Sequence, residues 1–481
     1  MTEPLAIEFA ISLDESLVFS QLSGDYNPLH VDPIAARRTQ FGGTVVHGIH
    51  AVLKAADLFS GIWLRSEVEP AAISIVFTNP VRSGERVSAC VATASERGRI
   101  RVTAVSAGHP AFSLTIRTAV MRQRKVLSTR IGEPIAPRGP RKLSFSPDLR
   151  SGEVPLEFDQ VLMTRLFPNL VHGDGHVWIA DLLGSTRIVG MEYPGLDSIY
   201  SGLNLARREQ GSTTDAAVMR YRVQKVDSRF RLARLTVSGV YFDGTLDTFF
   251  RPPAVAQRSL SKVVGSVESH LFRDHRALVI GGSRGLGEIA AKLLIAGGAD
   301  VTITYAQGLA DAGRIRAESQ ALGMSCAMQL FDASKPLQDV DREWLVGAGF
   351  SHVYFFASPH IEKNTSGTWN NQIFERFTNI YVRAFAEVVE AIASARNSAR
   401  PVRFLYPSSA FLDNHEPGFA EYCAAKAAGE ALAHHFARSM NAVVSTPRLP
   451  RMRTDQTSAL LDVGAEDAFP VILELLRGLR A

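Results

Sequence analysis

The sequence predicts a multidomain protein that is α+β in its first part and α/β in its last part. A chain of 481 residues is long enough for roughly three domains of about 150 residues each. Two successive sets of strand-like segments each accompany an apolar helix, and a proline-containing linker follows each set. The last part opens with a strand that runs through a glycine-rich turn into a helix, which indicates a doubly wound parallel sheet.

The composition argues against several kinds of function and location. The formal net charge is only +4, and no basic run is interleaved with aromatic residues, so we expect no nucleic-acid partner. Cys90, Cys326 and Cys423 are too few and too widely spaced for a disulfide framework or a cysteine zinc site, which suits a cytoplasmic protein. The first residues carry no basic run, and no apolar run reaches membrane-spanning length, so we expect neither a signal peptide nor a membrane segment.

The first domain is expected over residues 1–125. Residues 12–23 predict an entry helix that ends at Gly24, residues 33–38 predict a short helix, and residues 49–59 predict an apolar, alanine-rich helix. Alternating or β-branched patterns predict strands over residues 72–78, 86–94, 100–107 and 111–122.

One stretch of this domain, Gly24-Asp25-Tyr26-Asn27-Pro28-Leu29-His30-Val31-Asp32, places an acid and an imidazole five positions apart across a proline. Asn-Pro favours a turn, because the residue before a proline is kept out of the helical region. Asp25 and His30 therefore lie on either side of a bend and can point into one cleft. A carboxylate and an imidazole that converge in this way can share proton transfers. The alternative interpretation is a capped turn with a structural histidine.

These residues resemble the signature of the MaoC-like, R-specific enoyl-CoA hydratases, a hot-dog fold family. The matching residues are Gly24, Asp25, Asn27, Pro28, Leu29, His30, Asp32, Phe41 and the run Val46-His47-Gly48. The resemblance implies one long helix wrapped by antiparallel strands. It also implies that Asp25 and His30 handle the Cα proton and the leaving hydroxyl of a 3-hydroxyacyl thioester. Gly48 stands at the predicted helix start, so its amide either holds the charge on the thioester oxygen or merely permits close packing.

A second set of similar elements predicts a second hot-dog domain over residues 146–256. A helix is expected over residues 178–189, followed by strands over residues 216–226, 230–239 and 240–250. Residues 190–201 resemble a segment of other tandem hot-dog proteins. This half lacks the acid–imidazole signature, and neither His172 nor His176 has a carboxylate at the family spacing. We therefore expect a non-catalytic half that pairs with the first half to form one competent site.

The third domain is expected over residues 270–481. The strand at residues 277–280 runs into a glycine-rich turn and then into a helix over residues 288–296. In such a turn the backbone can approach a pyrophosphate, and the helix N-terminus faces the negative charge. The expected cofactor-binding residues of the turn are Gly281, Ser283, Arg284, Gly285, Leu286 and Gly287.

Further along, Tyr422 and Lys426 are one helical turn apart, Ser409 precedes Tyr422, and Asn379 lies upstream. With the glycine-rich turn, this constellation resembles the short-chain dehydrogenase/reductases, which have a Rossmann fold. The resemblance implies that Tyr422 donates a proton and that Ser409 holds the substrate carbonyl. It also implies that Lys426 lowers the tyrosine pKa and binds the nicotinamide ribose, while Asn379 completes a proton relay. The alternative is a Rossmann fold without activity.

Several residues favour NADP(H) as the cofactor. The second predicted strand ends at Tyr305, which offers no carboxylate to a ribose 2′-hydroxyl, and Arg284 can meet a 2′-phosphate. Asp332 matches the acid that contacts adenine in the family. The domain departs from the family pattern at three places, which are Ile280, the run Phe355-Phe356-Ala357-Ser358, and Arg448 after Pro447.

Together these resemblances predict a bifunctional enzyme that is a 3-oxoacyl reductase and an (R)-3-hydroxyacyl dehydratase. The two chemistries share the 3-hydroxyacyl thioester, carried on coenzyme A or on an acyl carrier protein. Two alternatives stay open, the reverse sequence of hydratase and dehydrogenase, and a non-catalytic protein that binds acyl thioesters or a carrier protein. The reductase resemblance also implies a homodimer. No metal site is expected.

Overall fold

In the computed structural model, the described part of the chain contains one ten-stranded antiparallel sheet and one six-stranded parallel sheet, besides a short pair of strands. The chain divides into a first unit that ends at Pro253 and a second unit that begins at Ala254. None of the helices described is long and apolar enough to span a bilayer. The structure describes residues 5–63, 68–93, 98–120, 135–146, 148–157, 159–170, 177–208, 217–364, 366–395, 400–457 and 464–479.

The strands of the first unit form a single sheet, in the order β1-β3-β4-β5-β2-β7-β10-β9-β8-β6. The clearest alternation is in β4, where every second residue is buried, because one face of the sheet covers the core. The strands are β1 (Leu5–Ala10), β2 (Val68–Phe77), β3 (Arg86–Thr93), β4 (Arg99–Ser106), β5 (His109–Val120), β6 (Ser151–Pro155), β7 (Ser198–Arg207), β8 (Val218–Asp227), β9 (Leu232–Ser238) and β10 (Phe242–Phe250).

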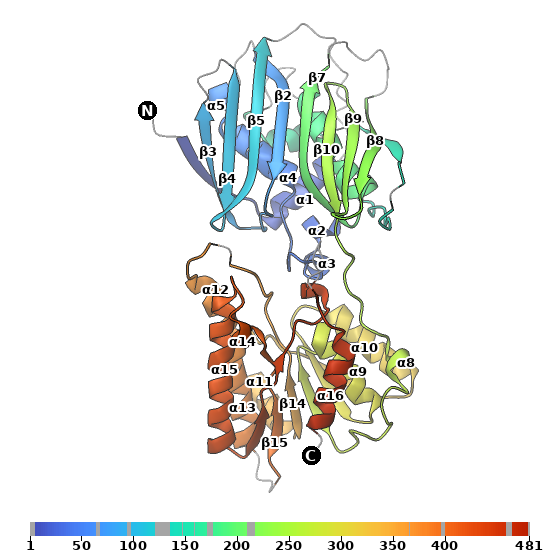
Figure 1. Ribbon diagram of the computed structural model, residues 1–481, viewed down its shortest axis with the longest axis vertical. Helices are drawn as coiled ribbons and strands as arrows, with labels where there is room; N and C mark the ends of the chain where they lie inside the picture. The colour runs from blue at the N-terminus through green and yellow to red at the C-terminus, as the bar shows by residue number, and fades with distance from the viewer. Residues whose placement is uncertain are drawn as a thin grey trace. The chain divides into compact units, whose positions relative to one another are not determined.

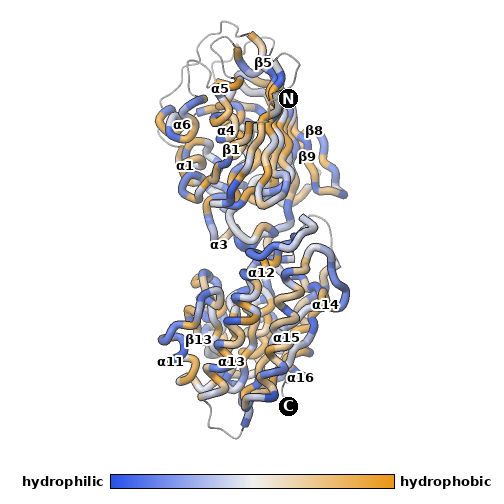
Figure 2. The backbone as a smooth tube through the Cα atoms, turned by 90° about the vertical axis from the view of Figure 1, so that its left-hand side faces the viewer, coloured by the Kyte–Doolittle hydropathy of each residue, from blue (hydrophilic) through white to orange (hydrophobic). Residues whose placement is uncertain are grey.

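The helices of the first unit lie together on one side of this sheet, as the turned view shows (Figure 2). Two of them, α4 in the first half and α7 in the second, are buried over most of their residues. The helices are α1 (Leu13–Ser23), α2 (Pro28–Val31), α3 (Pro33–Ala36), α4 (Gly48–Leu58), α5 (Ser60–Trp63), α6 (Gln160–Leu166), α7 (Val177–Arg187) and the π-helical turn η1 (Ile188–Glu192).

The two halves are joined into one body. Strand β2 of the first half pairs with β7 of the second, from Ala72 opposite Ala206 to Val76 opposite Gly202. A single hydrophobic core runs through both halves, and Trp63 packs edge-on against Trp178 within it, with ring centroids 5.9 Å apart. This arrangement confirms the predicted double hot-dog. The sequence did not predict β1, β6 or β7 as strands.

The second unit has a six-stranded parallel sheet in the order β13-β12-β11-β14-β15-β17, with helices on both faces (Figure 1). Alternate residues of β11 face two separate cores, since Ala277 and Val279 belong to one and Leu278 and Ile280 to the other. This is the predicted doubly wound α/β fold. The strands are β11 (Arg276–Ile280), β12 (Asp300–Tyr305), β13 (Cys326–Leu330), β14 (His352–Phe355), β15 (Val402–Leu405), β16 (Ser408–Ser409), β17 (Ala442–Ser445) and β18 (Arg448–Leu449).

The last two short strands, β16 and β18, pair with each other outside the main sheet. The helices of the second unit are α8 (Leu260–Val263), α9 (Gly285–Ala296), α10 (Leu309–Ala321), α11 (Asp339–Gly347), α12 (Asn371–Thr378), the π-helical η2 (Asn379–Ala384), α13 (Phe385–Ser394), α14 (Phe411–Asn414), α15 (Ala420–Ser439), the short η3 (Asp455–Thr457) and α16 (Ala468–Gly478).

A buried ion cluster fixes α9 against its neighbours. The ammonium of Lys292, only 1% exposed, lies 2.8 Å from Glu288 and 3.0 Å from Glu318, and it donates a hydrogen bond to the carbonyl of Arg258. Arg314 adds contacts of 2.9 Å and 3.0 Å to the same two carboxylates. Lys292 and Arg314 both pair with the buried carboxylate of Glu288. Without Lys292, this negative charge would keep only part of the positive charge that stabilises it.

We predict that Lys292→Met lowers the free energy of unfolding of the second unit by about 3 kcal/mol, because one partner of a buried ion cluster is lost. Hydrogen exchange of peptides from β11, β12 and α9 measures this. Arg477→Met is the matched control, since Arg477 pairs with Glu474 at the surface and should contribute less than about 1 kcal/mol. Equal protection in the two variants would contradict the prediction.

Candidate active sites

The turn that presents Asp25 is built by the end of α1. Ser12 and Glu15 form a reciprocal capping box at the start of this helix, and Gly24 ends it in the left-handed conformation with φ of 71°. A Cβ on Gly24 would lie 2.7 Å from the Nε atom of Arg187, so the close contact also requires glycine. The chain therefore turns sharply after α1, and Asp25 is directed into the interior, where it is 1% exposed.

The carboxylate of Asp25 is held by residues from both halves of the first unit. Its Oδ2 atom accepts a hydrogen bond of 2.7 Å from the Thr186 hydroxyl, and its Oδ1 atom accepts one of 3.2 Å from the Asn27 amide. Gly190 borders the same carboxylate so closely that a Cβ there would lie 2.1 Å from Oδ1. Burial raises the pKa of Asp25, while His30, Thr186, Asn27 and Arg187 act against this rise.

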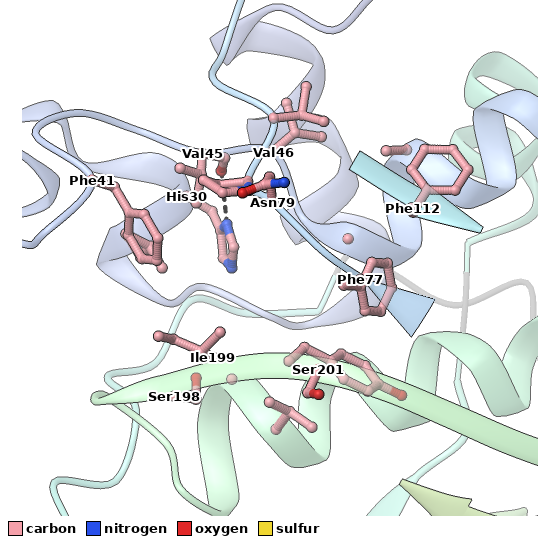
Figure 3. A pocket seen from close by; sticks show the side chains of 18 of the residues that line it. His30, Phe41, Val45, Val46, Phe77, Asn79, Phe112, Ser198, Ile199 and Ser201 are labelled. Atoms are coloured by element: carbon pink, nitrogen blue, oxygen red, sulfur yellow. Dashed lines mark hydrogen bonds between the residues drawn. The ribbon is translucent and has the colours of Figure 1, made fainter. Parts of the chain in front are cut away.

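His30 is oriented by its own hydrogen bond. It lies in the one-turn helix α2, whose start is capped by the Asn27 side chain, and its Nδ1 atom is 2.8 Å from the carbonyl oxygen of Val45. A carbonyl only accepts, so Nδ1 carries the proton and Nε2 carries the lone pair. Figure 3 shows this second nitrogen pointing into the open space between the two halves. Burial lowers the pKa of His30, which keeps the imidazole neutral.

The side chain of Asn27 ties this motif to the second half. Its amide donates hydrogen bonds of 3.0 Å to the carbonyls of Gly190 and Gly195, while its own oxygen caps α2 by accepting from the Leu29 amide. The Asn-Pro turn expected from the sequence is therefore present. The asparagine is required for more than its turn preference, because it connects α2 to the segment after α7.

Asp25 and His30 line one cavity of about 340 Å³, whose walls come from both halves. The first half supplies apolar residues such as Leu29, Val46, Phe77 and Phe112, and the second half supplies Val189, Ile199, Tyr200 and Phe249. Figure 3 shows the first-half residues above the cavity and strand β7 below it. A mostly apolar cavity with a few polar groups at one place is typical of a small-molecule site.

Gly48 lies at the first residue of α4 and also lines this cavity. The helical hydrogen bonds begin with the Ala51 amide, which donates to the His47 carbonyl, so the amide of Gly48 precedes the helical pattern. A Cβ on Gly48 would lie 2.6 Å from the Phe77 ring. Close packing is therefore one reason for the glycine, and an amide at a helix start on the cavity wall is compatible with an oxyanion role as well.

Asp25, His30 and His47 place donor atoms within 4.8 Å of one another, but the arrangement does not fit a metal. The two imidazole rings are stacked, with centroids 3.8 Å apart and planes 25° apart, so their lone pairs do not converge on one point. A bound transition metal requires donors that converge at about 2 Å. One nitrogen of each ring is also engaged with a backbone carbonyl.

In the second unit, the glycine-rich turn has the close contacts expected of a phosphate cradle. A Cβ on Gly287 would lie 2.2 Å from the Gly281 carbonyl, and one on Gly281, where φ is 75°, would lie 2.7 Å from the Ala357 amide. Ser283 is buried, and Leu286 packs partly against the core at the start of α9. The turn therefore leads directly into a helix N-terminus, which favours an anion.

Arg284, immediately before α9, forms an ion pair of 2.7 Å with Asp455 of η3. The other carboxylate oxygen of Asp455 lies 4.0 Å from the position of a Cβ on Gly285. A negative side chain thus borders the glycine-rich turn, a feature the sequence did not indicate. Tyr305 ends β12, and Asp332 follows β13 and accepts hydrogen bonds from the Ser334 amide and hydroxyl.

The expected catalytic residues of this unit lie on adjoining elements. Ser409 hydrogen-bonds Tyr422 near the start of α15, and Asn379 begins the π-helical η2. Burial raises the pKa of Tyr422 to about 12, so its hydroxyl keeps the proton. Lys426 donates to the Pro407 carbonyl, and its ammonium lies 3.8 Å from the centroid of the Tyr381 ring.

Lys426 is itself desolvated, and its ammonium is directed at the Pro407 carbonyl. Burial lowers its pKa to about 7. Burial raises the pKa of Tyr422, while its hydrogen bond with Ser409 lowers it. The expected lowering of this tyrosine pKa by Lys426 stays a prediction.

The three departures from the family pattern are accommodated locally. Beside Ile280, the Gly281 amide donates to the Thr304 hydroxyl, so the threonine comes from β12. Ser358 forms a hydrogen bond of 2.6 Å with the Tyr381 hydroxyl, which ties the loop after β14 to η2. Arg448 pairs with Glu430 at 2.7 Å and also with Asp413.

Comparisons with known proteins agree with this division. A family model described as MaoC like domain matches residues 2–111. An (R)-specific enoyl-CoA hydratase from Aeromonas caviae is 35% identical over 107 residues, which are 21% of this chain and 70% of that protein. The chain belongs to the MaoC-like family. A 3-hydroxybutyryl-CoA dehydratase from Methylorubrum extorquens is 34% identical over 109 residues, 21% of this chain and 66% of its own.

The MaoC-like domain is fused to a second one. A model described as short chain dehydrogenase matches residues 275–445. A short chain dehydrogenase from Burkholderia cenocepacia, solved with NADP, is 24% identical in sequence and has a TM-score of 0.39. The similar region is 44% of this chain and 91% of the Burkholderia chain. The chain thus combines a hydratase/dehydratase domain with a short-chain oxidoreductase domain.

Sequence reasoning missed the second-half residues of the MaoC-like site. Thr186 is 161 positions from Asp25, and Arg187 donates a 2.7 Å hydrogen bond to the Ser23 carbonyl, two residues before Asp25. No local motif marks either residue. Gly190 begins the segment that resembled tandem hot-dog proteins, which was the one available signal. His172 and His176 lie outside the described residues.

We predict that Thr186→Val lowers the kcat of enoyl-thioester hydration about tenfold, roughly 1.4 kcal/mol in barrier. The valine keeps the shape but removes the donor that lowers the pKa of Asp25, so this pKa rises further. Steady-state hydration kinetics measure the effect. Thr186→Ser keeps the hydroxyl and should stay within about threefold of the parent. A Thr186→Val enzyme as active as the parent would refute the role.

Proposed function

We propose that the chain is a bifunctional acyl-thioester enzyme that reduces a 3-oxoacyl thioester with NADPH and dehydrates the resulting (R)-3-hydroxyacyl thioester. The observation that carries this proposal is the convergence of the buried Asp25 carboxylate and the free Nε2 atom of His30 on one apolar cavity. Both similar proteins are named for CoA thioesters, which supports acyl-CoA as the substrate class. A carrier-protein thioester has the same reacting atoms.

In the dehydration, His30 accepts the Cα proton at Nε2, where its lone pair is free. Protonated Asp25 delivers a proton to the C3 hydroxyl, which leaves as water while the Cα–C3 double bond forms. Burial favours this division of roles, because it raises the pKa of Asp25 and lowers that of His30. The Gly48 amide, at the start of α4, stabilises charge on the thioester oxygen. Hydration is the same sequence in reverse.

The residues of the second unit fit a dinucleotide, since the turn from Gly281 to Gly287 packs tightly on its own backbone and leads into the N-terminus of α9. When bound, NADPH supplies the hydride that reduces the C3 carbonyl. Ser409 holds that carbonyl, and Tyr422 donates the proton that the alkoxide takes up, with Lys426 and Asn379 behind it. A tyrosine that retains its proton suits a donor, so its raised pKa favours reduction.

The reverse sequence, hydration followed by oxidation, is the second candidate, since the same groups serve both directions. It is favoured by the name of the Aeromonas caviae relative, a hydratase. Homodimer formation and the residue boundaries 1–125, 146–256 and 270–481 of the three domains belong to the proposal as well.

We predict that the two activities separate by mutation, because their acid–base groups lie in different units. Asp25→Asn removes the ionisable carboxylate and should lower dehydration about a hundredfold or more, with NADPH oxidation unchanged. Tyr422→Phe removes only the donating hydroxyl, so it should stop NADPH oxidation and leave dehydration intact. The measurements are absorbance of NADPH with a 3-oxoacyl-CoA and mass detection of the enoyl product.

The parent enzyme should convert this substrate to the enoyl form, whereas Asp25→Asn should stop at the 3-hydroxy compound. If Asp25→Asn, correctly folded, also stopped NADPH oxidation, separate sites would be ruled out. A parent that oxidised no NADPH with any 3-oxoacyl thioester would favour the non-catalytic binding protein instead.

A second prediction concerns cofactor choice. The protein should bind NADPH more tightly than NADH, because Arg284 can exchange Asp455 for the 2′-phosphate. Arg284→Ala should remove most of this preference. Asp455→Asn removes the charge that competes with the 2′-phosphate for Arg284, so it should tighten NADPH about tenfold, with a smaller effect on NADH. Titration calorimetry measures both cofactors with each variant, and equal curves for NADPH and NADH with the parent would count against the assignment.

A further inference from the structure

His47, which precedes Gly48, contacts both groups of the proposed acid–base pair. It is fully buried, and its Nε2 atom lies 3.0 Å from the backbone carbonyl oxygen of Asp25. Because a carbonyl only accepts, Nε2 is the protonated nitrogen. On its other side the ring stacks on His30, with centroids 3.8 Å apart. One side chain thus holds the backbone of Asp25 and covers a face of the His30 ring.

The surroundings of His47 keep it neutral. Its Nδ1 atom accepts no hydrogen bond within the described part of the chain, and Phe19 packs on it at 4.9 Å. Burial, assisted by the neighbouring His30 and His50, lowers its pKa well below the ordinary value. The ring that faces His30 is therefore neutral. His47 is not among the residues that line the cavity, so it cannot replace His30 in exchanging protons with a substrate there.

We infer that His47 is a positioning residue with two separable functions: its Nε2–H fixes the Asp25 turn, and its neutral ring supports the imidazolium that His30 becomes during proton transfer. The first function follows from the hydrogen bond to the Asp25 carbonyl. The second follows from the stacking, because an aromatic face stabilises a cation placed on it. The inference rests on the proposed roles of Asp25 and His30.

The charged and titratable groups that act on His30 are known from the structure. Asp25 raises the pKa of His30, and so does the hydrogen bond to Val45, whereas Arg251 lowers it. His47 adjoins His50, whose pKa burial lowers to about 3, and beyond it Lys54. Neither His47 nor His50 carries charge near neutral pH. Loss of the His47 ring should therefore act on His30 through the lost aromatic face rather than through a lost charge.

Two substitutions separate the two functions. Gln places an amide N–H where Nε2 lies, so His47→Gln retains the donor and loses the ring. His47→Phe retains an aromatic face and loses the donor. His50→Phe, in the first turn of α4, is the matched control, because His50 is equally buried and stacked on Phe19 at 4.6 Å but makes no hydrogen bond to the described residues. Its activity should stay within about twofold of the parent.

The experiment is the pH dependence of kcat and KM for hydration of trans-2-butenoyl-CoA by the full chain. The pH profile of kcat contains an apparent pKa that we assign to His30. For His47→Gln we expect this apparent pKa to fall by about one unit. For His47→Phe we expect this apparent pKa to stay in place while kcat falls about tenfold and KM changes less than about twofold. Circular dichroism verifies folding, and if the Phe variant does not fold, the Gln variant alone decides.

If both variants kept the kcat and the pH profile of the parent, the inference would be overturned. It would also be overturned if both lost kcat equally and the apparent pKa of His30 did not shift, because that result indicates a role in packing only. Asp25→Asn is measured alongside. If it hydrates as fast as the parent, the proposed function has failed, irrespective of His47. If it is inactive while both His47 variants behave as the parent, only the inference about His47 has failed.

Discussion

The hydrogen bond from Thr186 to Asp25 is the interaction on which the rest of the first unit depends. It crosses between the two halves and ends on a buried carboxylate, where an unsatisfied lone pair would be costly. The acid can be buried only if the second half is correctly placed. The continuous sheet from β2 to β7 and the single core provide that placement. A half that lacks the acid–imidazole signature is therefore a structural part of the proposed catalytic site.

Burial has opposite effects on the two members of the pair. It disfavours the charged form of each, so Asp25 tends to hold its proton and His30 tends to release it. One apolar environment thus favours a protonated carboxyl group and a neutral imidazole next to each other. Burial is the largest cause of both pKa shifts. In the second unit burial likewise disfavours the charged forms of Tyr422 and Lys426, so it raises the pKa of the tyrosine and lowers that of the lysine.

Much of this could be predicted from the sequence, because the evidence for it is local. The helix that ends at Gly24, the alternating strands and the glycine-rich turn before α9 each depend on neighbours within a few residues. Strand β7 was missed because only its last residues alternate between buried and exposed positions, and Gly202 interrupts the apolar pattern. Thr186, Asp455 and the direction of the Lys426 ammonium were missed for a different reason. Each depends on contacts between residues far apart in the chain, which no spacing rule describes.

The π-helical turn η1 has a consequence for how this site tolerates changes in chain length. Thr186 and Gly190 are four residues apart, lie on one helical face, and contact the same carboxylate. In this turn the Tyr193 amide donates to the Ile188 carbonyl and the Gly195 amide to the Val189 carbonyl, and the Gly190 carbonyl accepts from the Asn27 side chain. Deleting one residue between Thr186 and Gly190 would rotate everything beyond it by about 100°. The length of this segment is therefore constrained by Asp25, which lies in the turn after α1 in the first half of the unit.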